Sequence, residues 1–372
     1  MGTNGNRTNN NMTSNKGSRN AKAKTAKKNR RSIIILIIEL FILIVMGVIL
    51  WFVTRTTDEE EGVKKVILNT EELQIDKQVE ENEILDDYRT IALFGVDSTV
   101  GSLAKNTNSD TIMIASINKK TSEVKLMSVY RDTYLNLSND TYSKCNKAYA
   151  QGGPKQAISM LNVNLDLNIT DFVAVGFKGL MEAVDAVGGV YIDVTPAEIP
   201  HLNNYQKSIA DNMKISYQDV TESGLIKLNG LQATAYCRIR YVGNNDFERT
   251  QRQRTVLLAT LERAKRLSVS ELTSIVNNVF GNVLTSIDVT EMISILGELS
   301  KIKVVDEGGF PELEDLTTGD IGAHGNCIVP YNLEESVREF HIKFFGVENY
   351  ETSETLAEIS SIINSDTSPY IR

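Results

Sequence analysis

One uninterrupted apolar run near the N-terminus constrains this chain more than any other feature. Residues 33–53, IIILIIELFILIVMGVILWFV, contain a single ionisable side chain, Glu39. A helix of this length spans about 30 Å, the thickness of the hydrocarbon core of a bilayer. The polar sequence TRTTDEEEG follows the run, where a cleaved signal peptide would carry a small-residue cleavage site. We therefore expect an uncleaved transmembrane helix over 33–53.

Charge is distributed unequally on the two sides of this run. Residues 1–32 carry nine Lys or Arg and no Asp or Glu, although the whole chain has a formal net charge of -9. Because basic flanks stay in the cytoplasm, we expect a single-pass type II protein of the cell membrane with its acidic bulk outside the cell. The basic tail lacks aromatic residues and adjoins the membrane span, so attraction to anionic lipid explains it better than binding to nucleic acid. We expect no nucleic-acid partner.

Composition divides the chain into five parts. They are a cytoplasmic basic tail over 1–32, the membrane helix over 33–53, a polar stalk over 54–86, a folded extracytoplasmic domain over 87–345 and a C-terminal tail over 346–372. Within the domain over 87–345, short apolar runs such as TIALFGV and FVAVGF alternate with segments of helical spacing such as KGLMEAVDAV. This alternation predicts an α/β fold.

Five arginines occur within residues 236–254, YCRIRYVGNNDFERTQRQR. Arg238 and Arg240 are two positions apart and point the same way if the segment is extended. The planar guanidinium group donates two hydrogen bonds at once to phosphate oxygens. The cluster therefore predicts an anion site, and a solvated surface with ordinary salt bridges is the alternative.

The second half of this cluster has helical spacing. Asp246 is expected to cap a helix on which Arg249, Arg252 and Gln253 share one face, because residues three and four positions apart are neighbours on a helix. These side chains extend the predicted anion site.

Two carboxylates occupy positions where an open α/β sheet gathers ligands. Asp97 follows the apolar run IALFGV, and Asp110 begins the next run in NSDTIMI. Converging carboxylates repel each other unless a cation joins them, and Mg²⁺, or Mn²⁺ in its place, suits oxygen ligands beside phosphates. Arg131, in SVYRDT, can add positive charge to the same site. Capping of turns by Asp is the alternative explanation of both carboxylates.

Seven collinear pieces of the chain resemble the LytR–CpsA–Psr family of membrane-anchored transferases of cell-wall glycopolymers. In chain order they are LFGVD, SDTIMI, SVYRDTY, KCNKAYAQGG, VDAVGGVYIDV, LNGLQATAYCRIR and NDFERTQRQR, within about 90–262. The resemblance implies an α-β-α sandwich around a central mixed sheet, an apolar pocket for a polyprenyl chain, and a pyrophosphate held by Mg²⁺ and arginines. Tyr130, Asn108 and Lys147 depart from the family's usual residues, which bears on polymer preference and rate rather than on reaction class.

The resemblance also implies roles for individual residues of this chain. It implies that Asp97 and Asp110 hold the metal ion. It implies that the pyrophosphate is bound by Arg131, Arg238, Arg240, Arg249, Arg252 and Gln253. It implies catalytic roles for Asp97, Arg131, Arg238, Arg240 and Arg249.

The expected reaction moves a glycan phosphate, of wall teichoic acid or capsule type, from a polyprenyl-pyrophosphate carrier to peptidoglycan in a Gram-positive-type bacterium. Hydrolysis of polyprenyl pyrophosphates at the same site is one alternative. A non-catalytic, membrane-tethered module that binds polymer or regulates partners is the other.

Overall fold

The computed structural model describes residues 66–97, 103–104, 106–243, 245–268, 270–271, 283–287 and 301–371. The expected cytoplasmic tail, the membrane helix over 33–53 and the first part of the stalk lie outside these ranges. Within the described ranges, no helix is both long and apolar enough to cross a bilayer.

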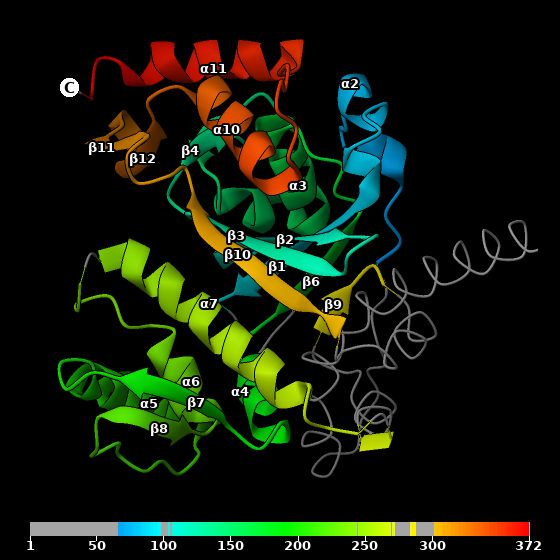
Figure 1. Cartoon of the computed structure of the whole chain (residues 1–372). Helices are drawn as coiled ribbons and strands as arrows, with labels where there is room; N and C mark the ends of the chain where they lie inside the picture. Colours follow the sequence, from blue (N-terminus) through cyan, green and yellow to red (C-terminus); the bar gives the residue numbers. More distant parts are fainter. Residues whose placement is uncertain are drawn as a thin grey trace, which may run out of the picture.

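A mixed β-sheet lies at the centre of the fold (Figure 1). Among the described residues it has six strands, which are, in spatial order, β10 (Lys303–Phe310), β3 (Glu123–Val129), β2 (Ser109–Asn118), β1 (Tyr88–Val96), β6 (Asp171–Val175) and β9 (Val283–Thr285). β2 pairs antiparallel with both β1 and β3, whereas β6 is parallel to β1 and β10 is parallel to β3. The prediction of an α/β fold with a central mixed sheet is confirmed.

Three helices from the middle and the C-terminal part of the chain cover one face of the sheet (Figure 1). They are α3 (Lys147–Leu165), α10 (Leu333–Phe345) and α11 (Glu354–Thr367). Shorter elements complete this layer: η1 (Thr70–Glu72), α2 (Lys77–Glu80), η2 (Leu85–Asp87), β4 (Tyr134–Asn136), β5 (Tyr142–Lys144), β11 (Leu316–Asp320), η4 (Gly322–His324) and β12 (Asn326–Pro330). Phe94 of β1, Phe172 of β6 and Phe344 of α10 are fully buried in the core between these elements and the sheet.

A second layer covers the opposite face, so the fold is an α-β-α sandwich (Figure 1). Its elements are α4 (Phe177–Ala186), β7 (Val190–Val194), α5 (Ile199–Met213), β8 (Gly224–Leu228), α6 (Gly230–Tyr236) and α7 (Asn245–Ala264). α6 begins with a capping box, in which Asn229 and Gln232 bond to each other's backbone N–H groups. α6 also packs closely on α4, because a Cβ atom at Gly230 would lie 1.9 Å from the carbonyl oxygen of Met181.

Two predicted boundaries are wrong. The stalk was expected to extend to residue 86, but residues 66–86 pack on the domain through Leu73, Val79 and Leu85, which are at most 1% exposed. The C-terminal tail was expected over 346–372, but α11 packs there through Leu356, Ile359 and Ile363. Apolar residues three and four positions apart form one face of a helix, and this face needs a partner.

Candidate active site

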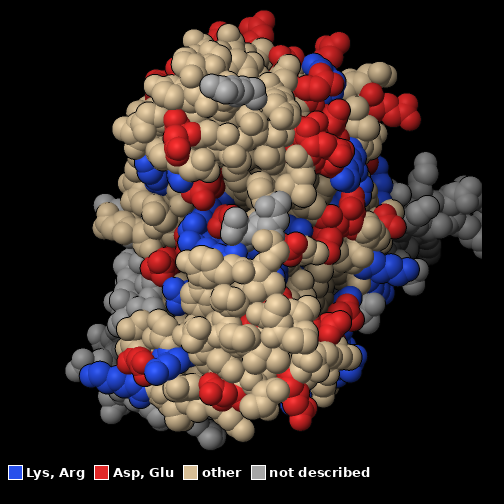
Figure 2. Space-filling view, turned by 90° about the vertical axis from the view of Figure 1, so that its left-hand side faces the viewer, with Lys and Arg blue, Asp and Glu red and all other residues tan. Residues whose placement is uncertain are grey.

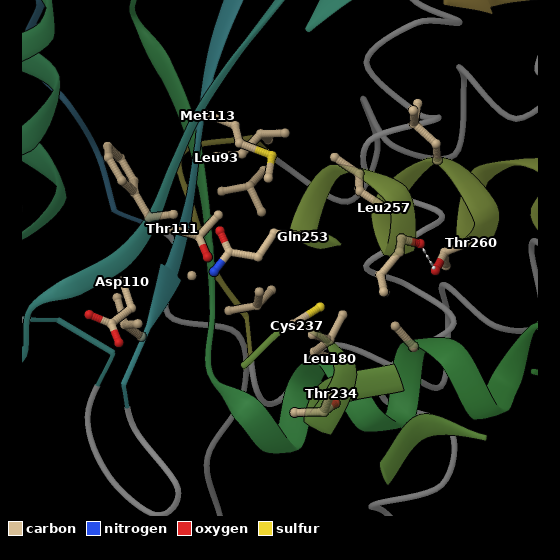
Figure 3. Close-up of a pocket in the computed structure, with 18 of the residues that line it drawn as sticks. Leu93, Asp110, Thr111, Met113, Leu180, Thr234, Cys237, Gln253, Leu257 and Thr260 are labelled. Carbon is tan, nitrogen blue, oxygen red and sulfur yellow. Dashed lines mark hydrogen bonds between the residues drawn. The ribbon is translucent and has the colours of Figure 1, made fainter. Parts of the chain in front are cut away.

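A cavity of about 330 Å³ lies between the sheet and helices α4, α6 and α7. Its interior is apolar, and its walls include Leu93, Met113, Ala115, Leu180, Leu257 and Leu261 (Figure 3). On β2 the lining runs from Asp110 to Ile117. At a rise of 3.3 Å per residue this is about 23 Å of strand. The cavity is therefore long enough for an extended apolar chain.

The charged residues of the same cavity gather at one end, together with Gln253. They are Asp97, Asp110, Arg238, Arg240 and Arg249. This end lies where β1 ends and β2 begins, and Gln253 points from α7 toward the strand that carries Thr111 and Asp110 (Figure 3). Figure 2 shows basic side chains gathered in a hollow across the middle of one face of the molecule. The structure thus brings together residues that are far apart in the sequence, as predicted.

A β-bulge places Asp110. Gly95 pairs with Thr111 and Val96 pairs with Ser109, so Asp110 is the additional residue on β2. A bulge of this kind turns a side chain out of the regular alternation of a strand. The two strand ends stay together beyond the bulge, because the N–H of Asp97 donates to the carbonyl oxygen of Asn108 at 3.3 Å. This pairing holds the two predicted metal ligands at the same end of the sheet.

Three arginines surround the carboxylate of Asp110. Arg131 Nη1 donates to Asp110 Oδ1 at 2.7 Å, while Arg240 Nη2 and Arg249 Nη1 lie 3.8 Å and 3.9 Å from Oδ2. Arg131 contacts the site from behind Asp110 and is not a lining residue of the cavity. Burial lowers the pKa of the Arg131 guanidinium group, but the nearby carboxylates raise it by more, and Asp110 contributes most of this effect. The net result is a raised pKa.

Asp246 joins two of these arginines, a role that the sequence analysis missed. α7 begins at Asn245, so Asp246 lies in its first turn and is not the residue before the helix. Its Oδ2 atom lies 3.0 Å from Arg249 Nη2 and 3.5 Å from Arg131 Nε. The spacing of Asp246 and Arg249, three positions apart on a helix, is the signal that predicts such a pair.

Arg249 is buried and retains an unmet hydrogen-bond donor. Burial lowers the pKa of Arg249 to about 10, and Asp246 offsets part of this effect, so the side chain stays charged at neutral pH. Its Nε atom has no hydrogen-bond acceptor among the described residues. A buried donor without an acceptor is costly, and an anion at the polar end of the cavity can provide one.

Arg238 is held by aromatic rings. Its guanidinium carbon lies 4.9 Å from the ring centroid of Phe177 and 5.3 Å from that of Tyr205. Within the described part of the chain, no carboxylate lies within ion-pairing distance of Arg238. Aromatic faces stabilise a cation without neutralising it. Arg238 therefore presents an uncompensated positive charge on the wall of the cavity.

The prediction that Arg252 contacts the anion is not supported by its position. Arg252 is 5% exposed and does not line the cavity. Its nitrogens donate to Glu198 and to two backbone carbonyl groups. Arg252 follows Arg249 by three positions, but the helix turns its side chain away from the cavity while Gln253 faces it.

A model of the LytR_cpsA_psr family matches residues 53–319. Biofilm regulatory protein A of Streptococcus mutans is 33% identical over 215 residues, which cover 54% of this chain and 50% of that protein. Polyisoprenyl-teichoic acid–peptidoglycan teichoic acid transferase TagU of Oceanobacillus iheyensis is 28% identical over 263 residues, which cover 68% of this chain and 73% of that protein. The match thus spans only half the length of the streptococcal relative.

A solved structure of a LytR-CPS2A-psr family protein, YwtF (TagT) with bound octaprenyl pyrophosphate lipid, has the same fold. It superposes with a TM-score of 0.52 at 20% identity, covering 81% of this chain and 98% of that one. The family model covers most of the described domain, including both strands of the Asp97–Asp110 pair and all of α7. The chain therefore belongs to the LytR_cpsA_psr family.

Proposed function

We propose that this protein transfers a glycan phosphate from a polyprenyl-pyrophosphate carrier to a hydroxyl group of peptidoglycan. The observation that carries the proposal is the cavity itself, which joins an apolar interior to an end lined by Arg238, Arg240 and Arg249. A polyprenyl pyrophosphate has the same division into a long apolar chain and a compact anion. The names of the teichoic acid transferase relative and of the lipid-bound structure agree with this substrate class.

The residues at the polar end suit Mg²⁺, or Mn²⁺ in its place. Asp97 is exposed at the cavity, and the described residues show no donor to its carboxylate. In the described part of the chain, no group of three or more His, Cys, Asp or Glu forms a metal cage. Mg²⁺ usually binds one or two carboxylates together with substrate phosphates, which is the arrangement that Asp97, Asp110 and a pyrophosphate would provide. When bound, the ion would neutralise charge on the pyrophosphate.

In the proposed reaction, the acceptor hydroxyl oxygen attacks the sugar-side phosphorus. A new P–O bond to peptidoglycan forms, the bond from this phosphorus to the bridging oxygen breaks, and polyprenyl phosphate leaves with the bonding electrons. Arg238, Arg240 and Arg249 stabilise the charge that develops on the phosphate oxygens, because donors already in place cost no reorganisation. Asp97, through a carboxylate oxygen that the metal ion does not occupy, takes the proton of the hydroxyl group.

The remaining side chains hold these groups in position. Arg131 fixes Asp110 from behind, Asp246 links Arg131 to Arg249, and the amide N–H group of Gln253 donates to the bound phosphate. We further propose that residues 33–53 anchor the protein in the cell membrane with the catalytic domain outside. This topology presents the cavity to lipid carriers in the outer leaflet.

A reconstituted reaction tests the proposal. The full-length protein in detergent micelles is mixed with a polyprenyl-pyrophosphate-linked glycan, Mg²⁺ and nascent peptidoglycan, and the products are read by mass spectrometry. The proposal predicts peptidoglycan carrying a phosphate-linked glycan, together with polyprenyl phosphate. Free phosphorylated glycan without linked polymer would indicate a hydrolase. No turnover, with cells unaffected by Asp97→Ala, would indicate a binding or regulatory module.

A further inference from the structure

Arg252 is a buried arginine of α7 whose three nitrogens all have partners within the protein. Nε donates to Glu198 Oε1 at 2.6 Å, Nη1 donates to the carbonyl oxygen of Ile239 at 3.2 Å, and Nη2 donates to that of Val242 at 2.9 Å. The fixed fork of the guanidinium group makes such a three-point contact specific to arginine. Arg252 is buried and does not line the cavity, so its function has to be found in what it holds.

The two carbonyl groups belong to the segment that carries the cavity arginines. Ile239 lies between Arg238 and Arg240 and is fully buried, and Val242 follows Arg240 by two positions. Residues 238–243 connect α6 to α7 and belong to no helix or strand. The N–H groups of Arg238 and Ile239 bond back to the last turn of α6. Arg252 fastens the segment on both sides of Arg240, through the carbonyl groups of Ile239 and Val242.

Glu198 extends this attachment to α5. Glu198 directly precedes Ile199, the first residue of α5. The Oε2 atom of Glu198 accepts hydrogen bonds from the backbone N–H and the hydroxyl group of Thr195. α5 carries Tyr205, one of the two rings that hold the guanidinium group of Arg238. The Glu198–Arg252 pair thus joins the start of α5, the 238–243 segment and α7, and the next residue of α7, Gln253, lines the cavity.

We propose that Glu198 and Arg252 are positioning residues that set Arg238 and Arg240 at the distance from Arg249 and Gln253 that a pyrophosphate requires. The inference rests on the proposed function, because it assigns the two residues to the recognition of the same diphosphate group. It also predicts a separation of effects. Loss of the pair should weaken recognition of the anion and leave the apolar interior of the cavity intact, since Arg252 does not line the cavity and its three hydrogen bonds go to Glu198, Ile239 and Val242.

Arg254 provides a matched control on the same helix. It is 9% exposed, compared with 5% for Arg252, and it is likewise bonded through its guanidinium group. Its partners lie on the sheet, where Nη1 donates to Ser128 Oγ at 2.9 Å and Nε lies 3.4 Å from Glu307. Arg254→Lys therefore disturbs a buried arginine of α7 without touching the 238–243 segment.

The experiment measures two affinities in the full-length protein in detergent micelles. Farnesyl diphosphate and farnesol each displace a fluorescent farnesyl probe from wild type, Arg252→Lys, Glu198→Gln and Arg254→Lys, and thermal unfolding confirms that each variant is folded. We expect Arg252→Lys and Glu198→Gln to bind farnesyl diphosphate at least tenfold more weakly than wild type does, with farnesol affinity within about twofold. Arg254→Lys should keep both affinities.

Three other results are informative. If the folded Arg252→Lys and Glu198→Gln variants keep the wild-type preference for the diphosphate over the alcohol, the positioning role is wrong. An equal loss of both affinities would assign the pair to general stability of the cavity and would also overturn the inference. If the wild-type protein does not bind farnesyl diphosphate more tightly than farnesol, the proposed function is wrong. The positioning role of Glu198 and Arg252 is then wrong as well, because it rests on that function.

Discussion

Arg131 Nη1 lies 2.7 Å from Asp110 Oδ1, and this contact joins a residue that follows β3 to the bulge of β2 at the polar end of the cavity. Both side chains are largely buried, and Arg131 also approaches Asp132 and Asp246. Asp110 is therefore held from behind by one arginine and faces two more across the cavity. The arrangement gives the carboxylate one orientation before any substrate arrives.

Removal of Arg131 should slow the proposed transfer far more than it weakens folding. We expect Arg131→Ala to lower the transfer rate by about 10–100-fold, the range typical of losing a group that orients a metal ligand. Arg131→Lys should recover only part of the rate, because a lysine cannot form the same planar fork. The rate is measured as linked polymer formed per unit time.

Arg338 is the control for this variant. It pairs with Glu334 and Glu335 on the surface of α10, and exposed pairs contribute little. Arg338→Ala should therefore keep the transfer rate within about twofold. If the transfer rate of Arg131→Ala is equally close to that of wild type, Arg131 has no role in the reaction.

The cavity should accept a larger side chain that the opposite core rejects. Ala115 of β2 lines the cavity, whereas Ala92 of β1 lies in the filled core on the other face of the sheet. We expect Ala115→Phe to weaken binding of farnesyl diphosphate at least tenfold with little change in melting temperature. Ala92→Phe should lower the melting temperature, because overpacking a filled core costs about 1–3 kcal/mol. A large loss of stability in Ala115→Phe, equal to that in Ala92→Phe, would show that the cavity is not open to a chain.

Mg²⁺ should bind cooperatively with the diphosphate. Without a ligand, the charge of Asp110 is already countered by Arg131, Arg240 and Arg249. We therefore expect the affinity for Mg²⁺, measured by calorimetry, to rise at least tenfold when farnesyl diphosphate is present. Linkage requires Mg²⁺ to strengthen binding of farnesyl diphosphate by the same factor. Asp97→Asn should reduce this coupling, and unchanged coupling in that variant would exclude Asp97 as a ligand.

Mild acid should destabilise the domain through His341 of α10. This imidazole is fully buried, stacks on Tyr350 at 3.7 Å between ring centroids, and meets the carbonyl oxygen of Leu165 through Nε2. Burial lowers the pKa of His341 from 6.5 to about 4. As pH falls below 6.5, the unfolded chain takes up a proton that the folded protein refuses, so the free energy of unfolding declines until about pH 4. The loss amounts to about 3 kcal/mol.

Comparison with His341→Phe isolates this contribution. Burial also raises the pKa of Asp166, which lies near Tyr350. The contribution of Asp166 to the pH dependence of stability has the opposite sign to that of His341, because protonation of Asp166 favours the folded state. Asp166 is present in both proteins, so the difference between their free energies of unfolding, followed by chemical denaturation from pH 7 to pH 4, reports His341. A difference that does not change with pH would contradict the assignment.

Much of the site could be predicted because its chemistry depends on residue types that are recognisable in a sequence. Asp97 and Asp110 follow and begin apolar runs, and Arg238, Arg240 and Arg249 fall within one short segment, so their convergence follows from strand order and helix spacing. Arg252 does not line the cavity because it lies about 60° around α7 from Arg249 and about 100° from Gln253. This rotation is enough to turn its side chain from the cavity to the backbone of residues 238–243.

The rest depended on packing that a sequence does not display. Met113 and Ala115 line an open cavity, while Ile114 between them lies in a filled core, yet all three are ordinary apolar strand residues. The bulge at Asp110 depends on how β1 and β2 pair. The contact of Asp246 with Arg131 depends on where the fold places Arg131, which the sequence does not show. α11 has a clear apolar face, and the error there was to treat a polar, terminal segment as unpacked.

The most direct test of the account follows the oxygen atoms of the transfer. The full-length protein converts a polyprenyl-pyrophosphate-linked glycan in H₂¹⁸O with nascent peptidoglycan present, and the products are analysed by mass. We predict a glycan joined to peptidoglycan through an unlabelled phosphodiester, formed at least tenfold more slowly by Arg131→Ala. Phosphorylated glycan carrying ¹⁸O, with no glycan on peptidoglycan, would contradict the account, since water would then be the acceptor.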